Sequence, residues 1–564
     1  MFCISIWDVS VVAIYIFAIL WLGWQAKKKV KSTGDYFMGN RRGNKIMMIA
    51  NAIGAGTHTN QAVLVAGATY EIGLAGVWYQ WFFLFATPFF WLIAPIYRRL
   101  RYITMADFFE KRYGSNMGVL YAFMGLLFFT LNIGLLLKGT STVLESITGG
   151  QLSTVVIVFG LTAFFLAYSV LGGLVSALRI NVLQGFFVVI LSFLLIPFAI
   201  NAGGGISAIK SNLPEYMFSF VAPKEVTLFF IVMVVFNGLV GVVVEPHHMA
   251  IGGAGKSELN CRTGWTYGNF VKRLATLGWA FIGVFVAALY PGLDHANREQ
   301  AFGLAVSKLL PVGLLGLMIS AMIAMVLGAS HNFMVGGSAL FTRNVYQKFF
   351  QKDSSDSNSL KVGRLSSFVI VIGGVTIALA LSSVLEGIKF LWQITSFFGL
   401  SFWLGVIWKK ANRYGAAASI IVMSSIAIIT GPWILKIPFE YQIALYLPAG
   451  FIVMIVTSLL TKSEPEEKLN EFFALLHTPV GEEYKLKQQN INIMLEGESQ
   501  SSKKSAEQED SLEKNGHSLL IVDFLSLFKK FNYKNYRIDL LGFGLAILFV
   551  LGILVLGFFS ASIG

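Results

Sequence analysis

Charged side chains are scarce in this chain of 564 residues: they make up 13% of it, whereas hydrophobic residues make up 55%. Apolar runs of about 20 residues, long enough to cross roughly 30 Å of hydrocarbon, recur along nearly the whole sequence. Lipid offers no partner to a free backbone group, so such runs are stable in a bilayer only as helices or closed barrels. The length and apolar character of the runs therefore predict an all-α integral membrane protein.

Enzyme motifs are missing as well. The sequence has no zinc-ligand spacing, no phosphate-binding loop and no nucleophile elbow. We therefore predict that the chain is not an enzyme, is not an ATP-driven pump and uses no organic cofactor. Cysteine is limited to Cys3 and Cys261. We expect no disulfide between them, because the topology described next places them on opposite sides of the membrane.

About fourteen apolar segments qualify as transmembrane helices. Their approximate bounds are 5–25, 44–70, 75–96, 117–147, 152–173, 182–203, 226–246, 265–292, 305–342, 364–383, 387–408, 414–435, 440–461 and 538–561.

The distribution of basic residues supports this count. If the lysine-rich loop after the first segment is cytoplasmic, strict alternation leaves only six of the 43 basic residues outside: Lys210, Lys224, Arg298, Lys308, Lys389 and Lys436. One miscounted helix would invert every later loop. We therefore predict a plasma membrane or bacterial inner membrane protein with both termini on the outer side. The net charge of +13 then belongs to membrane-facing loops and does not indicate a nucleic-acid partner.

Polar residues interrupt the second apolar segment between residues 51 and 61. Two glycines are followed by Thr57, His58, Thr59, Asn60 and Gln61. Backbone groups freed at membrane depth need partners that lipid does not supply, so such a break is tolerated where it lines a cavity. The segment 226–246 carries a second break, with Asn237, Gly238 and Gly241 before Glu245 and Pro246. The alternative is that its glycines only allow close helix packing.

Five blocks of the sequence resemble the sodium:solute symporter family, in the family's order. They are STGDYFMGNRR (32–42), TMADFFEKRYG (104–114), YSVLGGLVSALRINVLQ (168–184), LPVGLLGLMISAMIAM (310–325) and GVIWKKANRYGA (405–416). The resemblance implies a LeuT-like core of two inverted five-helix repeats, 44–203 and 204–408. Residues 1–43 would add a first helix and its loop, and residues 409–461 would add further helices. A cytoplasmic, partly disordered insert, 462–537, would precede the last helix in 538–564.

The resemblance also implies sodium sites, which this sequence weakens. The family's ion lies between carbonyls of the broken first core helix, here Ala50 and Ile53, and paired serine hydroxyls of the eighth. Gly328 and Ala329 stand in place of those serines and offer no side-chain oxygen. A second expected ligand, an aspartate, is Asn181 here, which keeps an oxygen but loses the charge.

Three hypotheses remain for the coupling ion. Ser330 supplies the missing hydroxyl if the helix is shifted by one residue, which keeps a poor Na⁺ site. Protons replace sodium if His58, His331, Glu71 or Glu245 carries them near the cavity. Otherwise the protein is an uncoupled facilitator or a membrane sensor that binds solute without transporting it.

The solute itself is predicted to be small, polar and organic. Candidate binding residues lie at the two breaks and on two further helices: Thr57, His58, Asn60, Gln61, Lys138, Asn237 and Gln393. Lys138 is charged at membrane depth and either contacts an anionic group of the solute or neutralises Glu71 or Glu145. His247 and His248, at a helix end, are interpreted as packing or capping residues. The sequence thus predicts a secondary transporter that works by alternating access.

Overall fold

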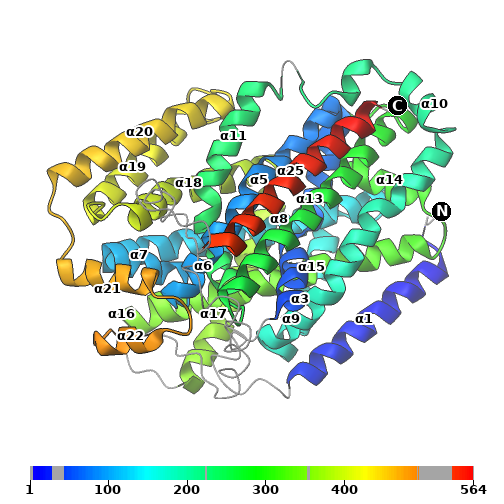
Figure 1. Cartoon of the computed structure of the whole chain (residues 1–564). Helices are drawn as coiled ribbons and strands as arrows, with labels where there is room; N and C mark the ends of the chain where they lie inside the picture. The colour runs from blue at the N-terminus through cyan, green and yellow to red at the C-terminus, as the bar shows by residue number, and fades with distance from the viewer. Residues whose placement is uncertain are drawn as a thin grey trace.

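The computed structural model describes residues 4–27, 44–222, 225–351, 356–491, 493 and 536–562, although for some of the helical residues, including 167–184, only the backbone is described. Within these residues the protein is a helical bundle without β-strands, and nine helices are both long and apolar enough to span a membrane (Figure 1). Five shorter apolar helices accompany them. The predicted all-α membrane architecture is confirmed.

The helices follow one another along the chain with short connections. They are α1 (Ile6–Lys27), α3 (Lys45–Gly56), α4 (Thr59–Ile72), α5 (Trp78–Ala86), α6 (Phe90–Leu100), α7 (Met105–Tyr113), α8 (Ser115–Ile147), α9 (Thr154–Ala202), α10 (Ile206–Ser211), α11 (Leu228–Gly241), α12 (Pro246–Gly252), α13 (Glu258–Leu289), α14 (Ala301–Leu309), α15 (Leu314–Phe341), α16 (Gln347–Phe349), α17 (Asp356–Ala380), α18 (Val384–Ile407), α19 (Arg413–Thr430), α20 (Phe439–Leu460), α21 (Glu466–His477), α22 (Glu483–Gln488) and α25 (Arg537–Ser562).

The first broken helix consists of α3 and α4. Helix α3 ends at Gly56, and Thr57 and His58 take extended backbone conformations before α4 begins. The Gln61 side chain accepts a hydrogen bond from the His58 amide at 3.4 Å, which satisfies one donor at the start of α4. The interruption predicted between residues 51 and 61 is therefore present.

The second broken helix consists of α11 and α12. A short 3₁₀ turn, Val242–Val244, leads to Glu245 in an extended conformation, and Pro246 then begins α12. Proline suits this first position because its missing N–H would have no partner inside the helix. Both helices that the sequence identifies as broken are thus broken in the structure.

Helix α13 packs unusually close to α3. A Cβ on Gly264 would lie 2.2 Å from the Cβ of Met48, and one on Gly268 would lie 2.6 Å from the Cβ of Ala52. Small residues allow such close approach of helices in membranes. The next step of four residues on both helices brings Lys272 to Gly56, the last residue before the break. The packing stripe therefore positions a charged side chain at the first broken helix.

Two predicted segments differ from the structure. The spans predicted at 152–173 and 182–203 fall in one helix, α9, whose 49 residues correspond to about 73 Å at 1.5 Å per residue. The span predicted at 305–342 begins later, because residues 310–313 separate α14 from α15 and Gly313 has φ of +88°. The number fourteen remains a prediction.

Part of the predicted insert 462–537 is folded onto the bundle. Helices α21 and α22 lie beside α6 and α7 (Figure 1). Arg99 of α6 pairs with Glu258 of α13 at 2.8 Å, and the same carboxylate accepts from the Val480 amide. Arg101 pairs with Glu483 at 2.9 Å. The segment predicted to be disordered, 487–518, lies almost entirely outside the described residues, as does an amphipathic stretch at 521–531.

Candidate functional site

A cavity lies between the two broken helices and is closed on a third side by α13. Its volume is about 120 Å³, several times the roughly 10–15 Å³ that one buried water requires. Helices α5, α6, α8, α15 and α18 complete the wall. The breaks therefore enclose a polar chamber, as expected for backbone that departs from helical geometry inside a membrane protein.

Two cations of α13 face this chamber. Lys272 and Arg273 are 9% and 2% exposed. The Arg273 guanidinium carbon lies 5.2 Å from the centre of the Phe83 ring, and its Nε and Nη1 atoms make no hydrogen bond within the described part of the chain. Glu245 is the acidic residue of the wall. With neutral imidazoles the wall carries two positive charges against one negative charge, so it favours an anion.

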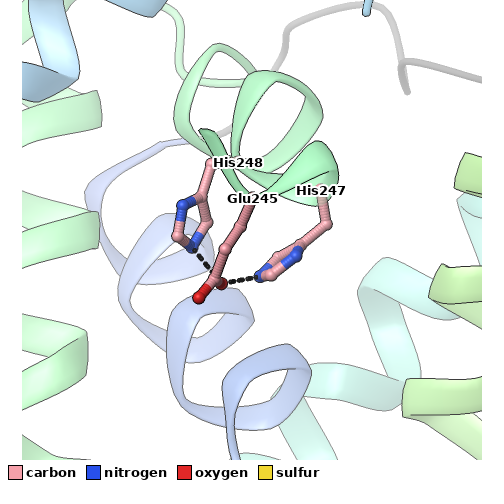
Figure 2. A group of neighbouring side chains, drawn as sticks. All are labelled: Glu245, His247 and His248. Carbon is pink, nitrogen blue, oxygen red and sulfur yellow. Dashed lines mark ion pairs between the residues drawn. The ribbon is translucent and has the colours of Figure 1, made fainter. Parts of the chain in front are cut away.

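Glu245, His247 and His248 form a compact cluster at the second break. The Nε2 atoms of His247 and His248 lie 3.5 and 3.4 Å from the same Glu245 oxygen, Oε2 (Figure 2). The His248 Nδ1 atom lies 2.7 Å from the Val242 carbonyl oxygen. The local fold makes this cluster, because the extended Glu245 turns its carboxylate back beneath the two rings that follow it.

Carboxamides and aromatic rings line the rest of the chamber. The carboxamides are Asn60, Gln61, Gln80, Asn132 and Asn269, and the rings include Phe83, Phe90, Phe128, Trp265, Phe333 and Trp392. Carboxamides donate and accept hydrogen bonds, whereas the rings cover apolar surface. This combination suits a small organic solute that carries both polar and apolar parts.

Several polar atoms of the first break have no partner in the described structure. They are Thr57 Oγ1, His58 Nδ1 and Asn60 Oδ1, all buried. Unsatisfied buried polar atoms cost free energy unless water or a ligand reaches them. Asn60, Gln61 and His58 line the chamber, and Thr57 lies directly beside them in the chain. The first break is therefore the richest source of free hydrogen-bonding groups in the wall.

Other residues predicted from the sequence lie away from the chamber wall. Lys138 interacts electrostatically with Glu299. Gln393 donates to Gln442 of α20 at 2.8 Å. Glu71 pairs with Arg298 and, at 2.6 Å, with His295. These three side chains are thus engaged elsewhere, and a role for them in solute binding or coupling stays a prediction.

Asn237 also lies outside the wall, although it is 1% exposed. Its Oδ1 accepts hydrogen bonds from the hydroxyls of Ser396 and Tyr446, and its Nδ2 donates to the Trp392 carbonyl at 3.2 Å. These contacts join α11 to α18 and α20. The arrangement makes Asn237 a structural link behind the chamber.

The predicted sodium position combines α3 and α15. Gly185 of α9 packs there, since a Cβ on it would lie 3.3 Å from the Ala50 carbonyl oxygen and 3.4 Å from the Ile53 side chain. On α15, Ala329, Ser330 and His331 are fully buried, and Ser330 Oγ has no hydrogen-bond partner within the described residues. Neither His331 nor Gly328 lines the chamber. The side chain of Asn181 lies outside what the structure describes.

Lys272 and Arg273 were missed as site residues, and so were Gln80, Asn132 and Asn269. The sequence held a signal for the two cations, because both fall inside the predicted span 265–292, where a charge is costly and usually functional. The loop-charge argument absorbed them as flanking residues. Gln80, Asn132 and Asn269 carry no such signal, since isolated carboxamides also form ordinary contacts between membrane helices.

Comparison with known proteins decides the family. Residues 36–422 match the sodium:solute symporter family. The chain belongs to this family. Among curated relatives, this symporter is 25% identical to a sodium/glucose cotransporter of Vibrio parahaemolyticus over 82% of its own length and 92% of the relative's. It is 27% identical to an osmoregulated proline transporter of Bacillus subtilis, over 80% of its own length and 94% of the relative's.

Solved structures show the same fold. A Na⁺-coupled sialic acid symporter in a substrate-bound, outward-open state superposes with a TM-score of 0.69 at 18% identity, over 81% of this symporter and 99% of that chain. The inward-facing conformation of Mhp1 gives a TM-score of 0.51 at 12% identity, over 78% and 96%. The expected LeuT-like architecture is confirmed, and the protein is a membrane transporter and not an enzyme.

Proposed function

We propose that this symporter moves a small organic anion through the chamber between its two broken helices. Family membership makes it a secondary transporter. The observation that carries the finer proposal is the pair of buried cations on α13, Lys272 and Arg273, for which the described wall offers a single carboxylate.

A buried guanidinium without an anionic partner is unfavourable, so a carboxylate on the solute would supply a missing interaction. The carboxamides of the first break then hydrogen-bond the solute's other polar groups. The aromatic rings would cover its apolar part. A neutral sugar would use the carboxamides but would leave the excess positive charge uncompensated.

Sodium coupling in this proposal is weak. The family supports Na⁺ as the coupling ion, yet α15 carries Gly328 and Ala329 where hydroxyls are expected. The buried, unpartnered Ser330 Oγ is the nearest candidate hydroxyl in the sequence, and the carbonyls of Ala50 and Ile53 would complete a sparse oxygen shell. Proton coupling through Glu245 is the competing proposal, because this carboxyl group lies in the chamber wall.

Uptake into proteoliposomes tests the proposal. Labelled monocarboxylates, sugar acids, neutral sugars and zwitterionic amino acids are compared under Na⁺ and proton gradients. We expect an anionic solute to be taken up. In Lys272→Gln its KM should rise by about 10- to 100-fold, which corresponds to losing a charged interaction of roughly 1.5–3 kcal/mol.

Lys308→Gln is the matched control, because Lys308 lies near the end of α14 outside the chamber wall. It should transport with an unchanged KM. Uptake of neutral solutes alone, or an anion KM that Lys272→Gln leaves unchanged, would contradict an anion site on α13.

A further inference from the structure

The cluster of Glu245, His247 and His248 has a feature that solute binding does not explain. All three side chains line the chamber, and one atom from each lies within 4.8 Å of the corresponding atoms of the other two. Figure 2 shows both imidazole rings turned towards one carboxylate oxygen. Two imidazoles and one carboxylate are a common ligand set for transition metals.

The hydrogen bond of His248 fixes what its other nitrogen presents. A backbone carbonyl can only accept, so the Nδ1 atom 2.7 Å from the Val242 oxygen carries the hydrogen. The neutral ring then has a lone pair on Nε2, and this lone pair faces the Glu245 carboxylate. Two acceptors repel unless a cation lies between them. A metal-bound histidine has this same arrangement, with its remote N–H donated to a carbonyl.

The separations within the cluster favour a metal over a shared proton. A hydrogen bond between an imidazole N–H and a carboxylate spans about 2.7–3.0 Å. The observed distances are 3.4 and 3.5 Å. Ligands about 2.0–2.1 Å from a tetrahedral Zn²⁺ are about 3.4 Å apart. The two nitrogen–oxygen distances therefore match edges of a zinc coordination tetrahedron.

Charged groups on neighbouring helices limit the affinity of such a site. His58 of α4 and Lys272 of α13 both act electrostatically on His247, and Lys272 and Arg273 act on Glu245. The two α13 cations oppose a divalent ion, whereas the single carboxylate attracts it. Removing the lysine charge should therefore strengthen metal binding.

We propose that Glu245, His247 and His248 bind a divalent transition-metal ion of the zinc class, with its fourth coordination position open to the chamber. The site lies at the second break, between α11 and α12, and the proposal does not depend on which solute is transported.

Metal titration of the full-length protein in nanodiscs tests the proposal. The chain is purified with a histidine-free affinity tag, stripped with chelator and titrated with Co²⁺, followed by competition with Zn²⁺. We expect one Co²⁺ per chain with the intense visible bands of a tetrahedral complex. Glu245→Gln and His248→Gln should each raise the Kd more than about 100-fold, since even outer-shell changes cost 10- to 100-fold. Lys272→Gln should lower it.

His295→Gln is the control, because His295 forms an exposed pair with Glu71 that is a possible adventitious metal site. Retained binding in this variant and loss in the cluster variants would support the proposal. The absence of saturable binding by the wild type would overturn it, and so would loss of binding in His295→Gln. Glu245→Gln keeps the shape of the side chain, so binding by this variant at wild-type affinity would also overturn the proposal if a histidine variant fails to fold.

Discussion

Lys272 of α13 reaches the first broken helix at Gly56, where a Cβ on the glycine would lie 3.6 Å from the lysine Nζ. That distance is an ordinary van der Waals contact. The stripe formed by Gly264, Gly268 and Lys272 against Met48, Ala52 and Gly56 brings the two residues together. An ammonium group therefore lies where the helix ends and the free groups of the break begin.

Gly56→Ala should impair transport more than stability. The added methyl fits sterically and favours helix at a helical position, yet it crowds the Lys272 ammonium inside the chamber. We expect the melting temperature to stay near that of the wild type and solute uptake to fall. Gly160→Ala is the matched control, because a Cβ there meets nothing within 4 Å. Equal uptake by the two variants would count against a role for the Gly56–Lys272 contact.

Restoring two hydroxyls on α15 should strengthen the response to sodium. The double variant Gly328→Ser with Ala329→Ser supplies the oxygens that a hard cation requires. We expect the Na⁺ concentration for half-maximal uptake to fall by about tenfold or more, equal to at least 1.4 kcal/mol of ion binding. Uptake measured against Na⁺, with choline as replacement, provides the readout.

Ser330→Ala is the companion variant for the same site. If Ser330 supplies the residual hydroxyl, its removal should abolish any remaining Na⁺ dependence while the protein still folds, because the buried Oγ has no partner to lose within the described structure. An unchanged sodium response in both variants would mean that the helix register assigned to α15 is incorrect.

Asn237→Ala should destabilise the protein without selectively weakening solute binding. The substitution leaves the hydroxyls of Ser396 and Tyr446 and the Trp392 carbonyl without their partner. We expect a loss of about 1–3 kcal/mol in unfolding free energy, measured as a lower melting temperature, with a KM near that of the wild type. A raised KM at unchanged thermal stability would instead favour direct solute contact.

Docking of α22 should weaken in acid. Burial alone would raise the pKa of Glu483, but its charge interaction and hydrogen bond with Arg101 outweigh this effect and hold the pKa below the ordinary 4.5. The stabilisation is therefore complete above pH 4.5 and is lost as the pH falls through the lower folded-state pKa. Because Glu483 is 34% exposed, we expect only about 0.5–1 kcal/mol, or roughly two- to fivefold faster amide exchange in α22.

Hydrogen exchange followed by mass spectrometry measures this change. Glu483→Gln should exchange faster at neutral pH and lose the acid dependence beyond that of intrinsic exchange. Glu482→Gln is the control, because Glu482 pairs only with Lys485 at an exposed position. Identical exchange in the wild type and Glu483→Gln at every pH would show that the ion pair does not hold α22 in place.

Much of the architecture could be predicted because it depends on local sequence. Hydrophobic length and helix-breaking residues identify the spans and both interruptions, since lipid leaves the backbone few alternatives. The resemblance supplied the family and the LeuT-like core, and both are confirmed. The division into repeats at 44–203 and 204–408 and the outer location of both termini remain predictions.

The composition of the chamber wall was decided by tertiary structure. Thr57 to Gln61 could be placed from the sequence because their helix breaks at these residues. By contrast, Gln393 faces Gln442, Lys138 lies near Glu299, and Glu71 pairs with Arg298. Lys272 enters the chamber because two glycines on α13 allow close approach to α3. Sequence determines which residues lie at membrane depth, but the rotation and packing distance of each helix decide which side chains meet, because these depend on contacts between residues far apart in the chain.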